Sequence, residues 1–357
     1  MKTKIMAIGA GLASSAFLLA AATGGSVAAK ASPAVAMGKS ALVLGDLGGS
    51  PGYVENFNPF SPTVLSGIGF MYEPMYVVNS LTGATTPWLA TSYKWVGNKE
   101  VQFTIRNGVK WSNGKPFTAQ DVVFTFNELK KYPAIDLNGL WTFLSSVSAS
   151  GNVVTFKFSK PDVPGLNFIM NQDIVYPGQF ERVNPVKFTD TNPIVTGPYT
   201  VATFNPNQYT LKANPRYWQR NKIHVPEITE VNVQNNTTAD LKLSEGTFDE
   251  AVLFEPGIQK VYVARNPKYY HYWFPLASPT SLSFNLTEKP FNNVKFRQAM
   301  AYAINKQAVY KQGEYGYEPP ASQSLLPPEM NPGWLNKSLA KKYAYNGYGN
   351  DSLNFGP

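Results

Sequence analysis

The strongest constraint on the fold lies in residues 101–124, where one structural pattern gives way to another over a short distance. Residues 101–106 alternate between apolar and polar side chains, and this period of two is expected of a half-buried strand. The Asn107-Gly108 pair that follows is typical of a tight turn. The first half of this stretch therefore predicts a strand that ends in a turn.

A helix is predicted shortly after this turn. Thr118 can cap its first turn, and Asp121 lies three residues later, where a negative charge favours the helix dipole. Pro133 marks the end of the helical pattern. The apolar residues between these signals share one helix face: Val122, Val123, Phe126 and Leu129.

Further strands and helices follow in irregular order. Alternation or short apolar runs predict strands near residues 41–44, 154–158 and 231–233. Helical spacing predicts two more helices, over residues 238–244 and 293–306. The chain has 28 Pro, 28 Gly and no internal repeat, so this mixture indicates an α/β or α+β protein with more than one lobe.

The first 31 residues have the pattern of an export signal. Two lysines precede an uncharged run from Ile5 to Ala22, and small residues follow the run. A membrane anchor is the alternative, but the run is near the lower length limit for a span. We therefore expect cleavage between Ala29 and Ser32, followed by a flexible lead-in over residues 32–41.

The chain contains no cysteine, which excludes a disulfide framework, a thiol nucleophile and a lipid-modified cysteine after the signal. We therefore expect a free periplasmic or extracellular protein. Only two histidines occur, without metal-motif spacing, and neither a nucleophile elbow nor a phosphate loop is present. The sequence thus predicts no metal, no cofactor and no catalytic residue.

Carboxylates are the remaining source of hydrolytic chemistry, because a secreted glycosidase needs two that face each other. Local structure explains the candidates better, as residues near helix starts, beside a turn or, for Glu128, on an exposed helix face. The candidates are Asp121, Glu128, Asp240, Glu245 and Asp249. We therefore expect a protein that is not an enzyme, with a glycosidase as a remote alternative.

The net charge of +8 is spread along the chain without the dense Lys/Arg run of a nucleic-acid footprint. No nucleic-acid partner is expected. Aromatic residues make up 14% of the chain, including seven tryptophans. Core packing explains any one tryptophan, whereas several of them in a cleft would stack on a ligand.

The stretch from Phe103 to Phe124 resembles the signature of bacterial extracellular solute-binding proteins, family 5, which are the oligopeptide, dipeptide and nickel binders of ABC importers. It has the same order of strand, Asn-Gly turn, Trp111, second turn and capped helix. Likeness to the family begins near Leu42. The other blocks that match follow the family's order: Asn56–Phe60, Pro87–Tyr93, Thr196–Tyr199, Asn214–Trp218, Ala239–Asp249 and Ser283–Lys306.

The resemblance implies an α/β, two-lobed periplasmic-binding-protein fold of the large, type II-like kind, with an extra inserted subdomain. Family members continue well beyond the position equivalent to Pro357, so the resemblance also implies a C-terminally truncated chain with an incomplete second lobe. The expected boundaries are 42–66 and 176–276 for lobe one, 67–175 for the inserted subdomain and 277–357 for the start of lobe two.

The function implied is the capture of short peptides between the lobes by a monomer that delivers them to the permease subunits of an ABC importer. The same fold binding oligosaccharides such as cellooligosaccharides is the alternative, because residues 132–141 and 271–275 resemble that branch. Cleft residues are expected from the early loop and from the crossover between the lobes: Asn58, Phe60, Ser61, Tyr272, Trp273 and Ser278.

Overall fold

The structure, a computed structural model, divides into two compact units, residues 1–38 and 39–357. Within the described residues no helix has both the length and the apolar character needed to cross a membrane. The residues described are 40–46, 52–79, 83–252, 256–272, 282–305, 308–313, 315–317 and 338.

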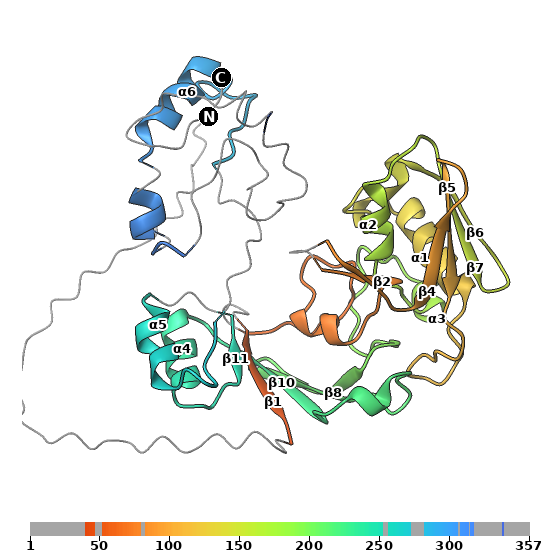
Figure 1. Cartoon of the computed structure of the whole chain (residues 1–357), viewed down its shortest axis with the longest axis horizontal. Coiled ribbons are helices and arrows are strands. Elements are labelled where there is room, and N and C mark those ends of the chain that lie inside the picture. Colours follow the sequence, from red (N-terminus) through yellow and green to blue (C-terminus); the bar gives the residue numbers. More distant parts are fainter. Residues whose placement is uncertain are drawn as a thin grey trace, which may run out of the picture. The chain divides into compact units, whose positions relative to one another are not determined.

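A five-stranded mixed sheet joins one strand from residues 42–46 to four strands from residues 199–251 (Figure 1). Strand β1 is flanked on both sides and pairs in parallel with β10 and β11, whereas β8, β9 and β10 pair in antiparallel order. The strand order is β11 (Glu250–Ala251), β1 (Leu42–Asp46), β10 (Glu227–Asn232), β9 (Gln208–Ala213) and β8 (Tyr199–Asn205). The early loop follows β1 and therefore starts from an inner strand of this sheet.

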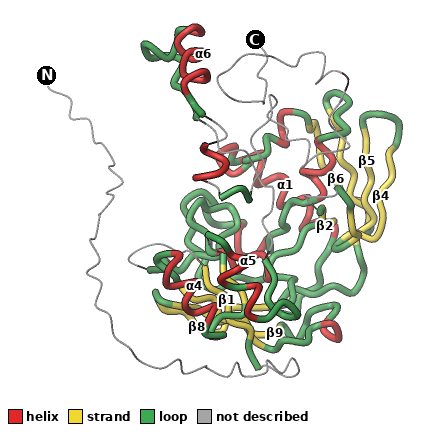
Figure 2. Tube along the Cα trace, turned by 60° about the vertical axis from the view of Figure 1, so that its left-hand side comes forward, coloured by secondary structure: helices red, strands yellow, loops and turns green. Residues whose placement is uncertain are grey.

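Two hydrophobic cores cover the two faces of this sheet. Successive residues of β1 point to opposite faces of the sheet, so Leu44 belongs to the large core and Val43 packs against the smaller core. Helices α4 (Asn236–Ser244) and α5 (Ile258–Val261) contribute buried residues to the smaller core (Figure 2). Gly45 lies on that side because a Cβ atom there would meet the Phe248 ring at 2.5 Å.

A separate four-stranded antiparallel sheet contains the strand that was predicted over residues 101–106. Helix α1 (Ala119–Lys131) covers one face of it, where the Phe126 and Phe156 rings lie 4.7 Å apart (Figure 1). The strand order is β4 (Ala90–Trp95), β5 (Glu100–Ile105), β7 (Val153–Phe158) and β6 (Leu144–Ser150).

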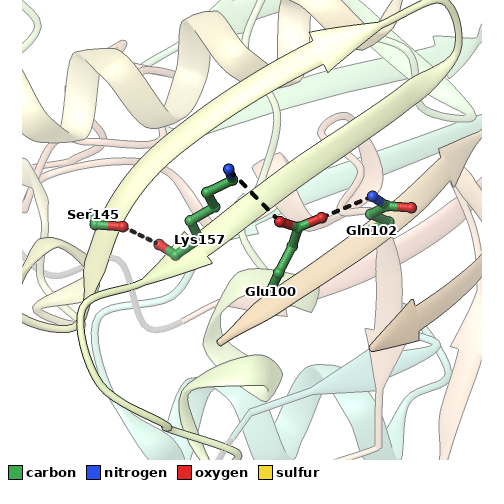
Figure 3. A network of polar contacts seen from close by, with 4 residues as sticks. All are labelled: Glu100, Gln102, Ser145 and Lys157. Carbon is green, nitrogen blue, oxygen red and sulfur yellow. Dashed lines mark hydrogen bonds and ion pairs between the residues drawn. The ribbon is translucent and has the colours of Figure 1, made fainter. Parts of the chain in front are cut away.

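The strand residues that point away from this core are polar and form a contact network (Figure 3). Glu100 on β5 lies 3.8 Å from the Lys157 ammonium on β7, and its other carboxylate oxygen accepts a hydrogen bond from Gln102 at 2.8 Å. The Ser145 hydroxyl donates to the Lys157 carbonyl. An ion pair of this exposed kind adds little stability, so the buried face holds the sheet together.

Asp121 fastens α1 to the loop before it. Its Oδ2 atom accepts hydrogen bonds from the Thr118 backbone N–H at 3.0 Å and from the Trp111 indole at 2.9 Å. Trp111 is completely buried, so the carboxylate also satisfies a polar atom of the core. The predicted cap is therefore confirmed, with a second partner in Trp111.

The remaining elements are short. The other helices are α2 (Gly165–Met170), α3 (Pro177–Phe180) and α6 (Val294–Ala303), with a π-helical turn at Val309–Gly313. Short 3-10 helices lie at Ser66–Phe70, Pro133–Ile135, Leu140–Thr142, Arg220–Lys222 and Val263–Arg265, and β2 (Tyr76–Val78) pairs with β3 (Thr85–Pro87).

The predicted strands and helices are confirmed with small shifts at their ends. The helix expected over residues 293–306 ends at Ala303, because Ile304 has an extended backbone. The expectation that Glu128 lies on an exposed face is wrong, since only 6% of it is accessible. It projects from α1 beside the core residues of that helix, and this burial raises the pKa of its carboxyl group.

Replacing Gly197 by Ala should destabilise the fold by about 1–3 kcal/mol. Gly197 donates its backbone N–H to the Met71 carbonyl at 2.9 Å, and an added Cβ atom would overlap that carbonyl. Displacing backbone atoms costs more free energy than displacing a flexible side chain. The segments around Met71 and Gly197 would therefore have to move apart. Urea denaturation measures the loss. Gly69→Ala is the matched control, because no atom lies within 4 Å of its Cβ position, and an equal loss in both variants would contradict this explanation.

Candidate functional site

The early loop after β1 is held by two buried asparagines. The Asn56 Oδ1 atom accepts from the backbone N–H groups of Asn58 and Asp190, and its amide donates to Ser61 Oγ at 2.9 Å. The Asn58 amide donates to the carbonyls of Pro185 and Phe188, both at 2.8 Å. The loop is therefore fixed from inside to residues more than a hundred positions later.

Of the loop residues predicted to contact ligand, two are buried. Asn58 is fully buried, and its Oδ1 atom accepts from the Phe60 N–H at 3.0 Å, so its side chain shapes the loop. Phe60 is 8% exposed and packs edge-to-face on Phe180 at 5.6 Å. Ser61 is partly exposed. A ligand contact by these residues stays a prediction, and Ser61 is the most accessible of the three.

Of the three residues predicted from the crossover between the lobes, Tyr272 is the one that lies among the described residues. Tyr272 is partly buried, accepts a hydrogen bond from Gln259 at 3.0 Å and lies 6.2 Å from the Tyr317 ring, measured between ring centroids. The Tyr317 hydroxyl in turn accepts from the Ile258 N–H at 3.0 Å. Trp273 and Ser278 lie outside the described residues. Tyr272 thus belongs to an aromatic group that joins α5 to a later part of the chain.

A polar cluster that the sequence analysis did not identify lies at the carboxyl end of β1. Asp46 Oδ2 accepts from the Ser66 hydroxyl at 2.7 Å, and the Tyr209 hydroxyl accepts from the Gly67 N–H at 2.9 Å. Glu230 lies beside Tyr209 in the register of β10 and β9. The carboxyl ends of parallel strands are where open α/β sheets bind ligands.

The sequence blocks that resemble the family meet in a different place, around the buried side chain of Glu73. The indoles of Trp88 and Trp218 both donate to Glu73 Oε1, at 2.6 and 3.1 Å. The Arg106 guanidinium stacks on Trp218 at 4.2 Å and donates to the Trp88 carbonyl at 2.7 Å. These tryptophans and this arginine come from three sequence blocks, so the blocks form one packed junction.

Neighbouring hydrogen bonds extend this junction between the two sheets. The Ser112 N–H donates to the Val195 carbonyl at 2.7 Å, and Arg216 donates to the Ser112 carbonyl at 3.0 Å. The Asn214 amide donates to the Gly197 carbonyl at 2.9 Å. These residues of the family blocks form hydrogen bonds to the backbone of neighbouring segments. This structural role accounts for their presence without a ligand.

A second carboxyl group lies next to Glu73. Asp173 is partly buried, and its backbone forms a bridge with Pro74. Burial, together with the neighbouring Glu73 charge, raises the pKa of Asp173 to about 7. Burial also raises the pKa of Glu73, although the hydroxyl and indole groups around it oppose the change. The pair therefore holds a proton near neutral pH more readily than isolated carboxyl groups do.

Replacing Asp173 by Asn should make the protein more stable at pH 8 and flatten its pH dependence. A carboxyl group whose folded-state pKa is raised stabilises the protein while protonated, and this stability is lost as the pH rises from about 4 to about 7. One pKa unit corresponds to about 1.4 kcal/mol, so a gain of about 1 kcal/mol or more is expected at pH 8. Urea denaturation at pH 5 and pH 8 measures it.

Asp240→Asn is the control for this measurement, because Asp240 lies on α4 and outside the carboxyl pair. A wild-type stability that rises between pH 5 and pH 8, with no difference for Asp173→Asn, would contradict the pairing.

Comparison with known proteins places this geometry in a family. Residues 84–347 match the model described as bacterial extracellular solute-binding proteins, family 5 Middle. A nickel-binding periplasmic protein of Escherichia coli (strain K12) is 25% identical over 299 residues, covering 78% of this chain and 55% of the relative. A dipeptide-binding protein of the same strain is 26% identical over 328 residues, covering 83% and 60%.

Solved structures agree with the sequence comparison. A periplasmic oligopeptide-binding protein of an oligopeptide ABC transporter from Thermotoga maritima, solved with mannohexaose bound, superposes with a TM-score of 0.74 at 28% identity. The match covers 87% of this chain and 60% of that one, so the chain spans little more than half the length of the proteins it resembles. The expected α/β, periplasmic-binding-protein fold is confirmed, and the chain belongs to the bacterial extracellular solute-binding proteins of family 5.

Proposed function

We propose that this chain belongs to the extracytoplasmic binding component of an ABC importer, which captures short peptides and delivers them to the membrane permease. The match of residues 84–347 to family 5 carries this proposal. Relatives named as dipeptide-binding and oligopeptide-binding proteins support a peptide ligand. The protein is proposed to work as a monomer outside the cytoplasm, after removal of its first 31 residues.

The sheets support a division into the proposed parts. Strands β1 and β8–β11 form one sheet from residues 42–46 and 199–251, whereas β4–β7 form another from residues 90–158. We assign the first sheet to lobe one and the second to the inserted subdomain. A second lobe would begin near residue 277 and close on the ligand, which removes water and strengthens each polar contact inside.

The ligand would then be held mainly by the crossover segment and by the exposed part of the early loop. The Asn58 amide already donates twice and its carbonyl oxygen accepts once, so it acts by keeping Ser61 in place. Tyr272 presents a partly exposed ring, and Trp273 follows it directly. Rings of this kind can stack on flat ligand surfaces.

Binding without chemical change is the expected activity. The relatives are named as binding proteins, and among the described residues no cluster of three His, Cys, Asp or Glu side chains suits a metal ion. Asp121, one of the candidate carboxylates for a glycosidase, is engaged in the cap of α1. We therefore propose that the solute leaves the protein unaltered.

An oligosaccharide ligand is the second candidate. The structure that superposes at a TM-score of 0.74 is described as an oligopeptide-binding protein and yet holds mannohexaose. Peptides and sugars both use aromatic stacking, so the fold alone does not select between them.

Replacing Trp273 by Ala should weaken solute binding about tenfold or more while leaving the fold intact. Aromatic stacking contributes about 0.5–1.5 kcal/mol beyond area burial, and removal of the whole ring adds lost contact area. Calorimetric titration of the full-length protein with peptide and cellooligosaccharide panels measures affinity and identifies the ligand class. Tyr269→Ala is the control, because Tyr269 is an exposed ring in the same segment.

Equal affinities of the wild type and Trp273→Ala would remove Trp273 from the site. Unfolding of the Trp273→Ala variant would show that this ring belongs to the hydrophobic core and not to the binding site. Release of a cleaved ligand, detected by mass spectrometry, would overturn the proposal that the protein is not an enzyme.

A further inference from the structure

Glu230 on β10 is a buried carboxyl group with no hydrogen-bond donor among the described residues. Only 3% of the residue is exposed, and no donor among the described residues hydrogen bonds to its side chain or forms an ion pair with it. Burial, together with the charges of Asp46 and Glu250, raises the pKa of Glu230 to about 7. A buried carboxylate is costly unless something compensates its charge.

Tyr53 is a second buried polar group close to this carboxyl group. The residue is 5% exposed, and its hydroxyl group has no hydrogen-bond partner among the described residues. Burial raises the pKa of this hydroxyl group, and the nearby Asp46, Tyr209 and Glu230 raise it as well. The Tyr209 ring packs edge-to-face on the Tyr53 ring at 5.3 Å, which places Tyr53 next to the strand residue that pairs with Glu230.

The other groups of the cluster are already oriented. The Ser66 hydroxyl donates to Asp46 Oδ2 at 2.7 Å, which leaves Oδ1 without a donor in the described part of the chain. The Tyr209 oxygen accepts from the Gly67 N–H at 2.9 Å and lies 3.4 Å from Ser66 Oγ. Asp46 and Glu230 lie on the same face of two adjacent parallel strands, since Leu44 pairs with Glu230 and Asp46 pairs with Asn232. The early loop brings Tyr53 to this face through its contact with the Tyr209 ring.

We propose that one Ca²⁺ ion binds between Asp46 and Glu230, with the Tyr53 hydroxyl as a third oxygen ligand and water completing the shell. The site is distinct from the proposed solute cleft contacts. An ion there would join β1 to β10 and to the loop segment that contains Tyr53, so it would stabilise the end of β1 from which the early loop leaves the sheet.

The ligand chemistry selects this class of ion. The available donors are oxygen atoms, which suit hard cations, and two carboxylates neutralise one divalent charge. A third acidic ligand is not available among the described residues. Mg²⁺ requires near-octahedral geometry and loses water reluctantly, whereas Ca²⁺ accepts irregular oxygen shells. In a largely buried and irregular site Ca²⁺ is therefore favoured over Mg²⁺.

The test is a calorimetric and thermal titration of the full chain after removal of metals with EDTA. Ca²⁺ should bind with a stoichiometry of one and raise the melting temperature by several degrees at saturation, and Mg²⁺ should act more weakly. No heat of binding and no thermal shift up to millimolar Ca²⁺ would overturn the proposal. Glu230 would then hold a proton in place of the ion.

Two variants locate the ion. Glu230→Gln keeps the shape of the side chain and should abolish Ca²⁺ binding, whereas Tyr53→Phe keeps the ring and should weaken binding about tenfold through loss of one ligand. Folding of each is checked by its circular dichroism spectrum. If Glu230→Gln does not fold, Tyr53→Phe decides alone, and unchanged Ca²⁺ affinity in Tyr53→Phe would overturn the assignment.

Glu128→Gln is the matched control. Glu128 is also buried, has a raised pKa and carries an unpaired Oε2 atom, but its neighbour is Lys131, at 3.7 Å. Ca²⁺ affinity should be unchanged in this variant. Loss of binding there as well would show that the effect arises from general destabilisation, and the proposed site would be rejected.

Discussion

The junction between the two sheets depends on one buried carboxylate, that of Glu73. A carboxylate in an apolar interior is tolerated only when donors surround it, and here two indole N–H groups meet on a single oxygen. The indoles of Trp88 and Trp218 are edge-to-face at 5.6 Å, and Arg106 covers the second ring. Segments from positions 73, 88, 106 and 218 are therefore held together by one charge and the rings that surround it.

This junction changes how the family blocks are understood. Trp111, which lies in the block from Phe103 to Phe124, is buried and bonded to Asp121. Trp88 and Trp218 bond to Glu73, and Asn214 supports the Gly197 carbonyl. The blocks identify the scaffold because packing restricts their residues. Ligand preference therefore has to come from the loops and crossover that this scaffold positions, which is the usual separation between fold and site.

The buried acidic groups fall into two kinds. Glu73 and Asp121 accept hydrogen bonds from indoles or backbone, whereas Glu230 receives none from the described residues. The first kind stabilises packing. The second kind is a cost to folding unless a proton or a cation compensates it, and such groups are often found where proteins bind something. The difference arises from the surroundings of each carboxyl group, because the Asp and Glu side chains themselves are chemically alike.

The sequence by itself determined the local elements and the family. Strand β5, the cap of α1 and the positions of α4 and β10 follow from side-chain periods and turn residues, which act over a few positions. Only the tertiary structure decided which polar groups are buried together. Glu128 has the spacing of a surface residue yet is buried, and Tyr53, Asp46 and Glu230 meet across almost two hundred positions. Burial and long-range pairing depend on how the sheets and loops pack, and no local period encodes that.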